Sequence, residues 1–239
     1  MPPVFAFYCF RAFLHRMDSL VYFSKFYYCT FAGNSTLFPA SERDNWKKLC
    51  TFAAEMDVQI SDIALELERL ATLRGKSFVK QLELITRYKG FQPIEDELSI
   101  LHIGMEQDKD FPKLLDAARK AVAFGYRVYI LPNPHGIRSA DFIFERKGIL
   151  RLYDLKTVHG KSSVESQLLD SIGQTNRVLL NMTTDYNARL LSSEIKAYFE
   201  ANKQAVEVLI FKGRKSISVS RWQVDAPMFN RFFRKKYEK

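Results

Sequence analysis

The sequence is poor in cysteine. Its 239 residues include only three cysteines, Cys9, Cys29 and Cys50, and no two of them have the CxxC spacing. An odd number without that spacing argues against a disulfide framework and against a thiolate zinc site. We therefore expect a reducing, cytoplasmic environment. A chain of this length can bury enough apolar surface to fold without cross-links.

Long uncharged apolar runs are also absent. Residues 1–38 hold 12 of the aromatic side chains, but charged residues such as Arg11, Arg16 and Lys25 interrupt them. No charge-free run reaches the roughly 18 residues that cross a bilayer, so no membrane span is predicted. A signal peptide fits poorly because no basic start precedes the apolar stretch. Residues 1–56 are interpreted as an aromatic-rich extension, either poorly packed or lying at a membrane interface.

The sequence contains no internal repeat and no low-complexity tract. Its excess of positive charge is moderate, with 36 Lys and Arg against 27 Asp and Glu, a net charge of +9 and a pI of about 9.4. Such an excess is compatible with a polyanionic partner but does not establish one.

Helical spacing of apolar residues begins near residue 57. Apolar side chains recur on one helical face from Ile60 to Ala71, and a second helical stretch, 77–88, follows Gly75. Residues 89–110 contain Gly90, Pro93, Gly104 and many charges, which predicts a boundary. We interpret residues 57–105 as a helical adaptor layer.

From residue 110 the pattern predicts an αβββαβ order of elements. The expected elements are a helix over 111–124 capped by Asp110, strands over 127–131, 141–145 and 149–156, a helix from Ser162 or Ser163 to about Thr175, and a strand over 178–182. A helix over 187–202 and a hairpin of 205–211 and 216–222, turning at Gly213, are expected to follow. The predicted fold class is α/β.

The hairpin over 141–156 brings three ionisable side chains together. If its turn is Lys147-Gly148, Asp141 lies opposite Asp154 with Cβ atoms roughly 5 Å apart. Lys156 projects from the same face because side chains alternate along a strand. Two carboxylates this close repel each other unless a cation compensates them. Mg²⁺ suits the pair, because it takes one or two carboxylates together with waters or phosphate oxygens.

A divalent cation at this position would activate a water for phosphodiester hydrolysis, and Lys156 could orient that water or neutralise the developing charge. The same three residues across a hairpin also occur as a purely structural salt-bridge cluster. That interpretation stays open at this point.

The trio and the order of elements resemble the PD-(D/E)xK nuclease core, in which an Asp on the second strand and a (D/E)xK on the third hold the metal. More specifically, five segments look like the C-terminal nuclease domains of contact-dependent growth inhibition (CdiA) toxins: Val128-Tyr-Ile-Leu-Pro-Asn, Ala140-Asp-Phe-Ile, Asp154-Leu-Lys-Thr157, Ser162-Ser and Gly173-Gln-Thr-Asn-Arg-Val-Leu-Leu180. The resemblance covers roughly residues 110–182, extends less clearly over 183–222, and covers none of 1–90.

The resemblance implies a restriction-endonuclease-like core over 106–224 that uses Mg²⁺ or Mn²⁺. Asp141 and Asp154 would hold the metal, and Lys156 would complete the catalytic set. Some members of that family cut tRNA and others cut DNA, so the expected substrate is nucleic acid, with RNA favoured. An immunity protein is the other implied partner. The sequence departs from the family pattern at Ala140, which replaces a proline, and at Asp154, which replaces the usual glutamate.

Other members of the site are less defined. Related cores can place a glutamine of the second helix at the site, which makes Gln174 an additional catalytic candidate, although it shares with Gln167 a polar stripe of the kind that is usually solvated. A third acid stays open, because Asp116 projects away from the apolar face of its helix and Glu106 and Asp110 precede that helix.

Two other functions fit the same region. A metal-independent ribonuclease would use side chains such as Lys156, Thr157, His159 and Lys161 as base and charge stabiliser, with His135 as a further loop histidine. A non-catalytic adaptor of a mobile element would bind nucleic acid without cutting it, although the intact trio argues against this. The basic tail, 225–239, either contacts nucleic acid or packs its aromatics on the domain.

Overall fold

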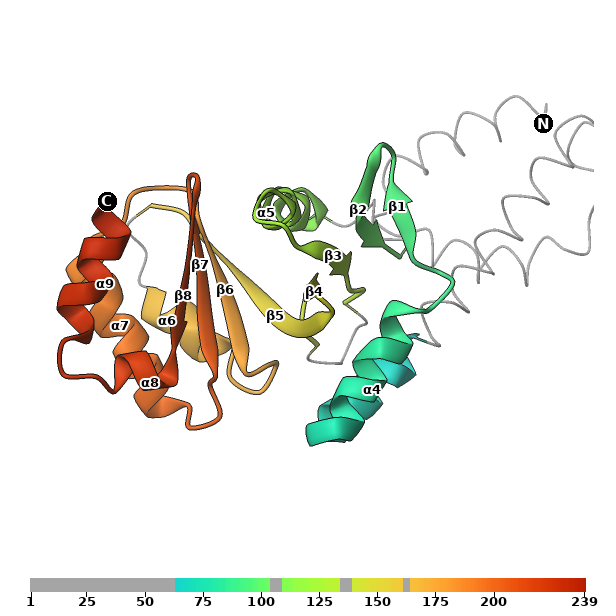
Figure 1. Cartoon of the computed structure of the whole chain (residues 1–239), viewed down its shortest axis with the longest axis horizontal. Coiled ribbons are helices and arrows are strands. Elements are labelled where there is room, and N and C mark those ends of the chain that lie inside the picture. The colour runs from blue at the N-terminus through green and yellow to red at the C-terminus, as the bar shows by residue number, and fades with distance from the viewer. Residues whose placement is uncertain (1–62, 104–108, 134–138, 161–163) are drawn as a thin grey trace, which may run out of the picture. The chain divides into compact units, whose positions relative to one another are not determined.

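The computed structural model describes residues 63–239 apart from 104–108, 134–138 and 161–163 (Figure 1). The aromatic-rich extension predicted over 1–56 lies outside these residues. The described part is a mixed α/β fold built on one eight-stranded sheet whose strands lie side by side in chain order, β1 to β8. None of its described helices is long and apolar enough to cross a membrane.

A helix over residues 63–72 comes first. The elements after it are α4 (Gly75–Thr86), β1 (Gln92–Ile94), β2 (Glu97–His102), α5 (Phe111–Ala123), β3 (Arg127–Ile130), β4 (Phe142–Arg146), β5 (Ile149–Val158), α6 (Val164–Asp170), β6 (Arg177–Met182), α7 (Ala188–Ala201), β7 (Glu207–Lys212), β8 (Lys215–Ser220), α8 (Arg221–Val224) and α9 (Phe229–Glu238). The predicted αβββαβ order is confirmed as α5, β3, β4, β5, α6 and β6.

The sheet is parallel where helices cross over between its strands. β2 and β3 are parallel, as are β5, β6 and β7, and the remaining neighbours are antiparallel. The crossovers between the parallel pairs contain α5, α6 and α7. Helices must cover both faces of such a sheet, because its strands are apolar on both. Figure 1 shows α5 on one side of β6 and β7, and α7 and α9 on the other.

Each helix layer has its own core. α5 buries Leu114, Ala117, Ala118 and Ala121, which recur at helical spacing, against one face of the sheet. On the other face α6, α7 and α9 bury an apolar cluster that includes Leu168, Ile195 and Phe233. Side chains of even number on β5 and β6, such as Val158 and Leu180, belong to this second cluster, whereas Tyr153 and Leu179 belong to the first.

Three details differ from the prediction. Asp110 does not cap α5, because its own backbone is helical and its carboxylate instead accepts from Lys113 Nζ at 2.7 Å. α6 ends at Asp170, earlier than expected, and its predicted cap at Ser162 or Ser163 lies outside the described residues. Strands β1 and β2 lie in the segment interpreted as a boundary; β2 pairs with β3 through Ile100, which is fully buried.

Candidate functional site

The β4–β5 hairpin has the register that the sequence predicts. Phe142 pairs with Tyr153, and the pairing continues to Arg146 and Ile149, so that paired numbers sum to 295. Lys147 and Gly148 form the turn with φ angles of 53° and 73°. Two consecutive left-handed residues are typical of the type I′ turn, whose twist matches that of the strands.

Asp141 lies directly before β4 and is held at two points. Its backbone N–H donates to the carbonyl of Tyr153 at 3.0 Å. Its Oδ2 atom accepts a hydrogen bond from the backbone N–H of Leu155 at 2.6 Å. Both contacts are to β5, so the carboxyl group of Asp141 is fixed beside the middle of that strand, next to Asp154.

Asp154 and Lys156 form an ion pair on the same strand. Lys156 Nζ lies 2.9 Å from Asp154 Oδ2, and the exposed fractions of the two side chains are 19% and 3%. Period-2 alternation places both on one face of β5. The structure therefore brings Asp141, Asp154 and Lys156 together, as the predicted register requires.

The trio contains two acids and one cation in a buried setting. Burial, and then the charge of Asp154, raise the pKa of Asp141 to about 7. Burial also raises the pKa of Asp154, although Lys156 and the hydrogen bond from Asp141 oppose this. We interpret the pair as sharing one proton: Asp141 is the protonated member and donates to the Asp154 carboxylate, which faces Lys156.

The trio sits where β5 changes its neighbour. Residues 149–153 of β5 pair with β4, whereas residues 154–158 pair with β6. Beyond Tyr153 no described strand therefore lies along the β4 edge of β5, and the Asp141 carboxylate occupies part of that edge. Figure 1 shows β5 connecting the two halves of the sheet.

The donor set suits a hard divalent cation. Two carboxylates and one ammonium leave one excess negative charge when both acids are ionised, and Mg²⁺ commonly uses one or two carboxylates with water and phosphate oxygens in the other positions. Within the described ranges, no group of three or more His, Cys, Asp and Glu side chains could hold a metal by itself. The protein ligands offered here are therefore Asp141 and Asp154.

The structure separates the two glutamines of the predicted stripe. Gln174 lies in the turn after α6, half-buried, and donates to the carbonyl of Asp170 at 3.5 Å. Gln167 is within α6, between Val164 and Leu168, which are fully buried. Its Oε1 atom is buried without a hydrogen-bond partner in the described structure. A catalytic role of Gln174 stays a prediction. Gln167, within α6, has a buried amide oxygen that is free to accept a hydrogen bond.

Asp116 belongs to a different cluster. Its Oδ2 accepts from Lys120 Nζ at 2.7 Å and from Asn181 Nδ2 at 2.8 Å, and Lys120 also donates to Asn181 Oδ1 at 2.8 Å. Asn181 pairs with Thr157, an odd-numbered residue of β5, and so faces α5. Asp154 and Lys156 face the opposite side. Asp116 therefore links α5 to β6 on the side of the sheet away from the trio, and Glu106 lies outside the described residues.

Of the two loop histidines, the structure describes only His159. His159 follows β5, and its Nδ1 atom lies 3.0 Å from Thr183 Oγ1. His135 and Lys161 lie outside the described residues. His159 therefore lies at the carboxyl end of β5, three residues beyond Lys156.

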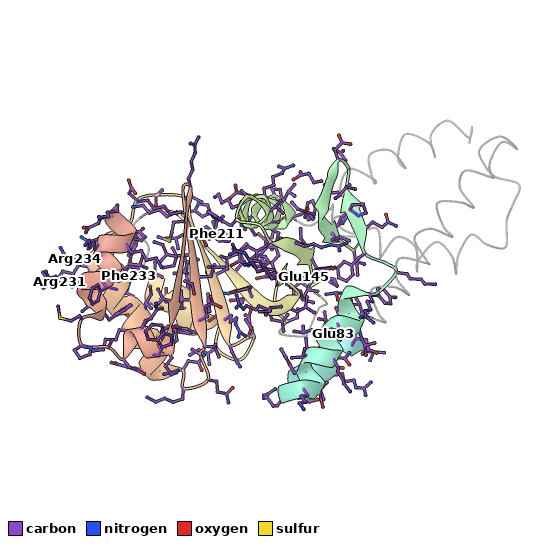
Figure 2. All side chains as sticks on the ribbon, viewed as in Figure 1. Glu83, Glu145, Phe211, Arg231, Phe233 and Arg234 are labelled. Carbon is purple, nitrogen blue, oxygen red and sulfur yellow. The ribbon has the colours of Figure 1, made fainter. Side chains whose placement is uncertain are left out.

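The basic tail is a packed helix. α9 buries Phe229, Phe233 and Tyr237 in the same apolar core as α7, and places Arg231 and Arg234 outside (Figure 2). This confirms packing on the domain for Phe229, Phe233 and Tyr237, whereas Phe232 is exposed. Contact of the outer cationic face with nucleic acid stays a prediction.

Comparisons of the chain with protein-family models, with curated proteins and with solved structures find no match.

Proposed function

We propose that this chain is a nuclease that hydrolyses phosphodiester bonds with Mg²⁺ or Mn²⁺, using a restriction-endonuclease-like core of α5, β3, β4, β5, α6 and β6. The observation that carries the proposal is the buried trio, in which Asp141 Oδ2 accepts from Leu155 N–H and Lys156 Nζ contacts Asp154 Oδ2. The resemblance to the nuclease domains of CdiA toxins supports RNA, including tRNA, over DNA and an immunity protein as a partner.

The charge balance of the trio favours a functional site over a structural salt bridge. A structural bridge needs one acid for Lys156, and Asp154 already supplies it. Asp141 adds a second carboxyl group whose ionisation is opposed by burial and by Asp154. A buried group of this kind destabilises the fold when charged, unless a ligand compensates it. A bound cation would do so.

Each residue then has a defined role. A divalent cation, when bound, supplies acidification of the attacking water and neutralisation of charge on the phosphate. Asp141 and Asp154 would hold it, and Asp141 would lose its proton on binding. Lys156, released from part of its pairing with Asp154, can donate a hydrogen bond to the phosphate oxygen on which negative charge develops.

The test is a cleavage assay of the full chain on tRNA and on plasmid DNA. Cleavage should disappear in EDTA and return with Mg²⁺ or Mn²⁺. Asp154→Ala should abolish it, and Asp170→Ala, which changes an exposed acid of α6, should retain it. Undiminished cleavage in EDTA would reject the metal role and support the metal-independent ribonuclease. Equal activity of wild type and Asp154→Ala would indicate a contaminant or a non-catalytic binder.

A further inference from the structure

A second feature of the molecule lies at the carboxyl ends of β6 and β7. A cavity of about 520 Å³ is formed there by the segment between β6 and α7, the start of α7, the end of β7 and the end of α9. Its lining includes three cationic side chains, Lys212, Arg189 and Arg234. The volume is in the range of ligand-binding cavities.

The acids of this cavity only partly neutralise its cations. Lys212 Nζ lies 3.0 Å from Asp185 Oδ1 and 4.1 Å from the centre of the Tyr237 ring. Arg234 Nε lies 3.8 Å from Glu238 Oε1. The side chains of Asp185 and Glu238 are 90% and 58% exposed, so these pairs are weak and an incoming anion can replace them.

Arg189 adds the excess charge. It is exposed at the first turn of α7, and it has no salt bridge with any residue in the part of the chain that the structure describes. Three cations against two outward acids leave one excess positive charge, which favours anions over cations. Tyr186 and Tyr237 are buried in its wall and so do not offer a face on which a base could stack.

The cavity lies on the same face of the sheet as the trio. Val158, Met182 and Lys212 are aligned across β5, β6 and β7, and Lys156 is one pleat before Val158. Lys156 and Lys212 are two strand spacings apart across the sheet and two residues apart along the strands. Their Cα atoms are therefore roughly 12 Å apart. His159 and Thr183, which are in contact, follow the carboxyl ends of β5 and β6. A few nucleotides of an extended strand span such a distance.

We propose that this cavity binds backbone phosphates of a single-stranded nucleic acid whose scissile phosphate lies at Asp141 and Asp154. This inference rests on the proposed function. The buried trio favours a single strand, since a flexible strand can bring one phosphate to carboxylates that a regular duplex would keep at a distance. Because the cavity offers cations and no stacking face, binding is tolerant of base sequence.

The experiment compares an arginine pair of the cavity with a matched pair elsewhere. Arg189→Ala/Arg234→Ala removes two cavity cations, and Arg69→Ala/Arg87→Ala removes two exposed arginines, one in the helix over residues 63–72 and one directly after α4. The probe is a fluorescein-labelled twelve-nucleotide oligouridine, measured by anisotropy in EDTA so that it is not cleaved. The cavity pair should raise the Kd about 5- to 20-fold and flatten the slope of log K against log[salt] by about 1.4. The matched pair should change neither.

Specific outcomes overturn the inference. Equal losses for the two arginine pairs would assign the effect to general charge, and an unchanged Kd for the cavity pair would remove the cavity from binding. A labelled twelve-base-pair duplex that binds as tightly as the single strand would overturn the choice of substrate.

The cavity and the proposed chemistry can fail separately. Wild-type protein that binds the oligonucleotide through Arg189 and Arg234 but cleaves nothing in Mg²⁺ would refute the nuclease and retain the binding site. Wild-type protein that cleaves in Mg²⁺ at a rate unaffected by Arg189→Ala/Arg234→Ala, at substrate concentrations below KM, would refute the cavity and retain the nuclease.

Discussion

The backbone N–H of Leu155 donates a 2.6 Å hydrogen bond to Oδ2 of Asp141. The Asp141 carboxyl group thereby binds the edge of β5 next to the start of β4. Asp141 itself lies just outside β4, and its carboxyl group lies beside Asp154. This contact fixes the position of an acid whose pKa is raised, mainly by burial, to about 7. The contact therefore gives Asp141 a structural role in addition to the chemical role proposed for it.

Asp141→Asn is expected to stabilise the metal-free protein at high pH. The pKa of Asp141 rises on folding from 3.8 to about 7, so the native state holds this proton more tightly and the free energy of unfolding falls as pH rises from about 4 to about 7. Asparagine can accept from Leu155 and donate to Asp154, as the protonated acid does. In EDTA the gain should be about 4 kcal/mol at pH 8, on the order of 10 °C in Tm, and near zero at pH 4.

The control for this titration is Asp170→Asn, which changes an exposed acid of α6. Its Tm should follow wild type at both pH values. A gain for Asp141→Asn that is the same at pH 4 and pH 8 would contradict the shared-proton interpretation. The Asn variant should at the same time lose metal-dependent cleavage.

Lys156→Met should lower stability more than removal of an exposed lysine. The Asp154 carboxylate is 3% exposed, and without Lys156 its charge is buried without a compensating cation, at a cost of about 2 kcal/mol or more near neutral pH. Lys113→Met removes an exposed ion pair with Asp110 and should have no measurable effect. Urea unfolding measures both.

A double-mutant cycle isolates that pair. Once Asp154→Asn has removed the buried charge, Lys156→Met should cost less than it does in the wild type. Additive losses would show that Lys156 stabilises the fold through packing rather than through Asp154.

Asn181→Ala should destabilise the fold and leave the chemistry intact. The substitution leaves Asp116 and Lys120 without their partner on β6, at a cost of about 1–3 kcal/mol. Because Asn181 faces α5 and the trio faces the other side, cleavage per folded molecule should equal that of wild type. Asp116→Ala should also retain cleavage. Loss of cleavage in Asp116→Ala without a loss of stability would instead make Asp116 the third metal-binding acid.

Two neighbouring phenylalanines of α9 should respond in opposite ways. Phe233 is 4% exposed in the core shared with α7, and Phe233→Ala should cost about 3–4 kcal/mol. Phe232 is 66% exposed, and Phe232→Ala should leave the midpoint of thermal unfolding unchanged. Equal effects would contradict the packing of this helix. Deleting residues 225–239 would therefore remove part of the core, and substitutions such as Arg231→Ala test the outer face more cleanly.

The parts of the fold that follow from local signals could be predicted from the sequence. Lys147-Gly148 between two β-prone segments specifies the turn, and the turn specifies the register that puts Asp141 next to Asp154. The apolar spacing from Leu114 to Ala121 specifies α5 in the same way. Each signal is contained within a few residues.

Features that depend on distant partners could not be predicted. Strand β2 is half exposed, and its parallel pairing with β3, through Ile100 and Val128, joins it to the rest of the sheet. The contact of Asp116 with Asn181 joins residues 65 positions apart. Likewise, the spacing of Phe229, Phe233 and Tyr237 is the same whether they pack or bind, and only the position of α7 shows that they pack.

The change of neighbour along β5 also affects when the site can exist. The half of β5 that carries Asp154 and Lys156 finds its hydrogen-bonding partner only in β6, which begins at Arg177. Synthesis must therefore proceed beyond Arg177 before the trio can be held in place. Incomplete chains and proteolytic fragments that end before this residue lack β6.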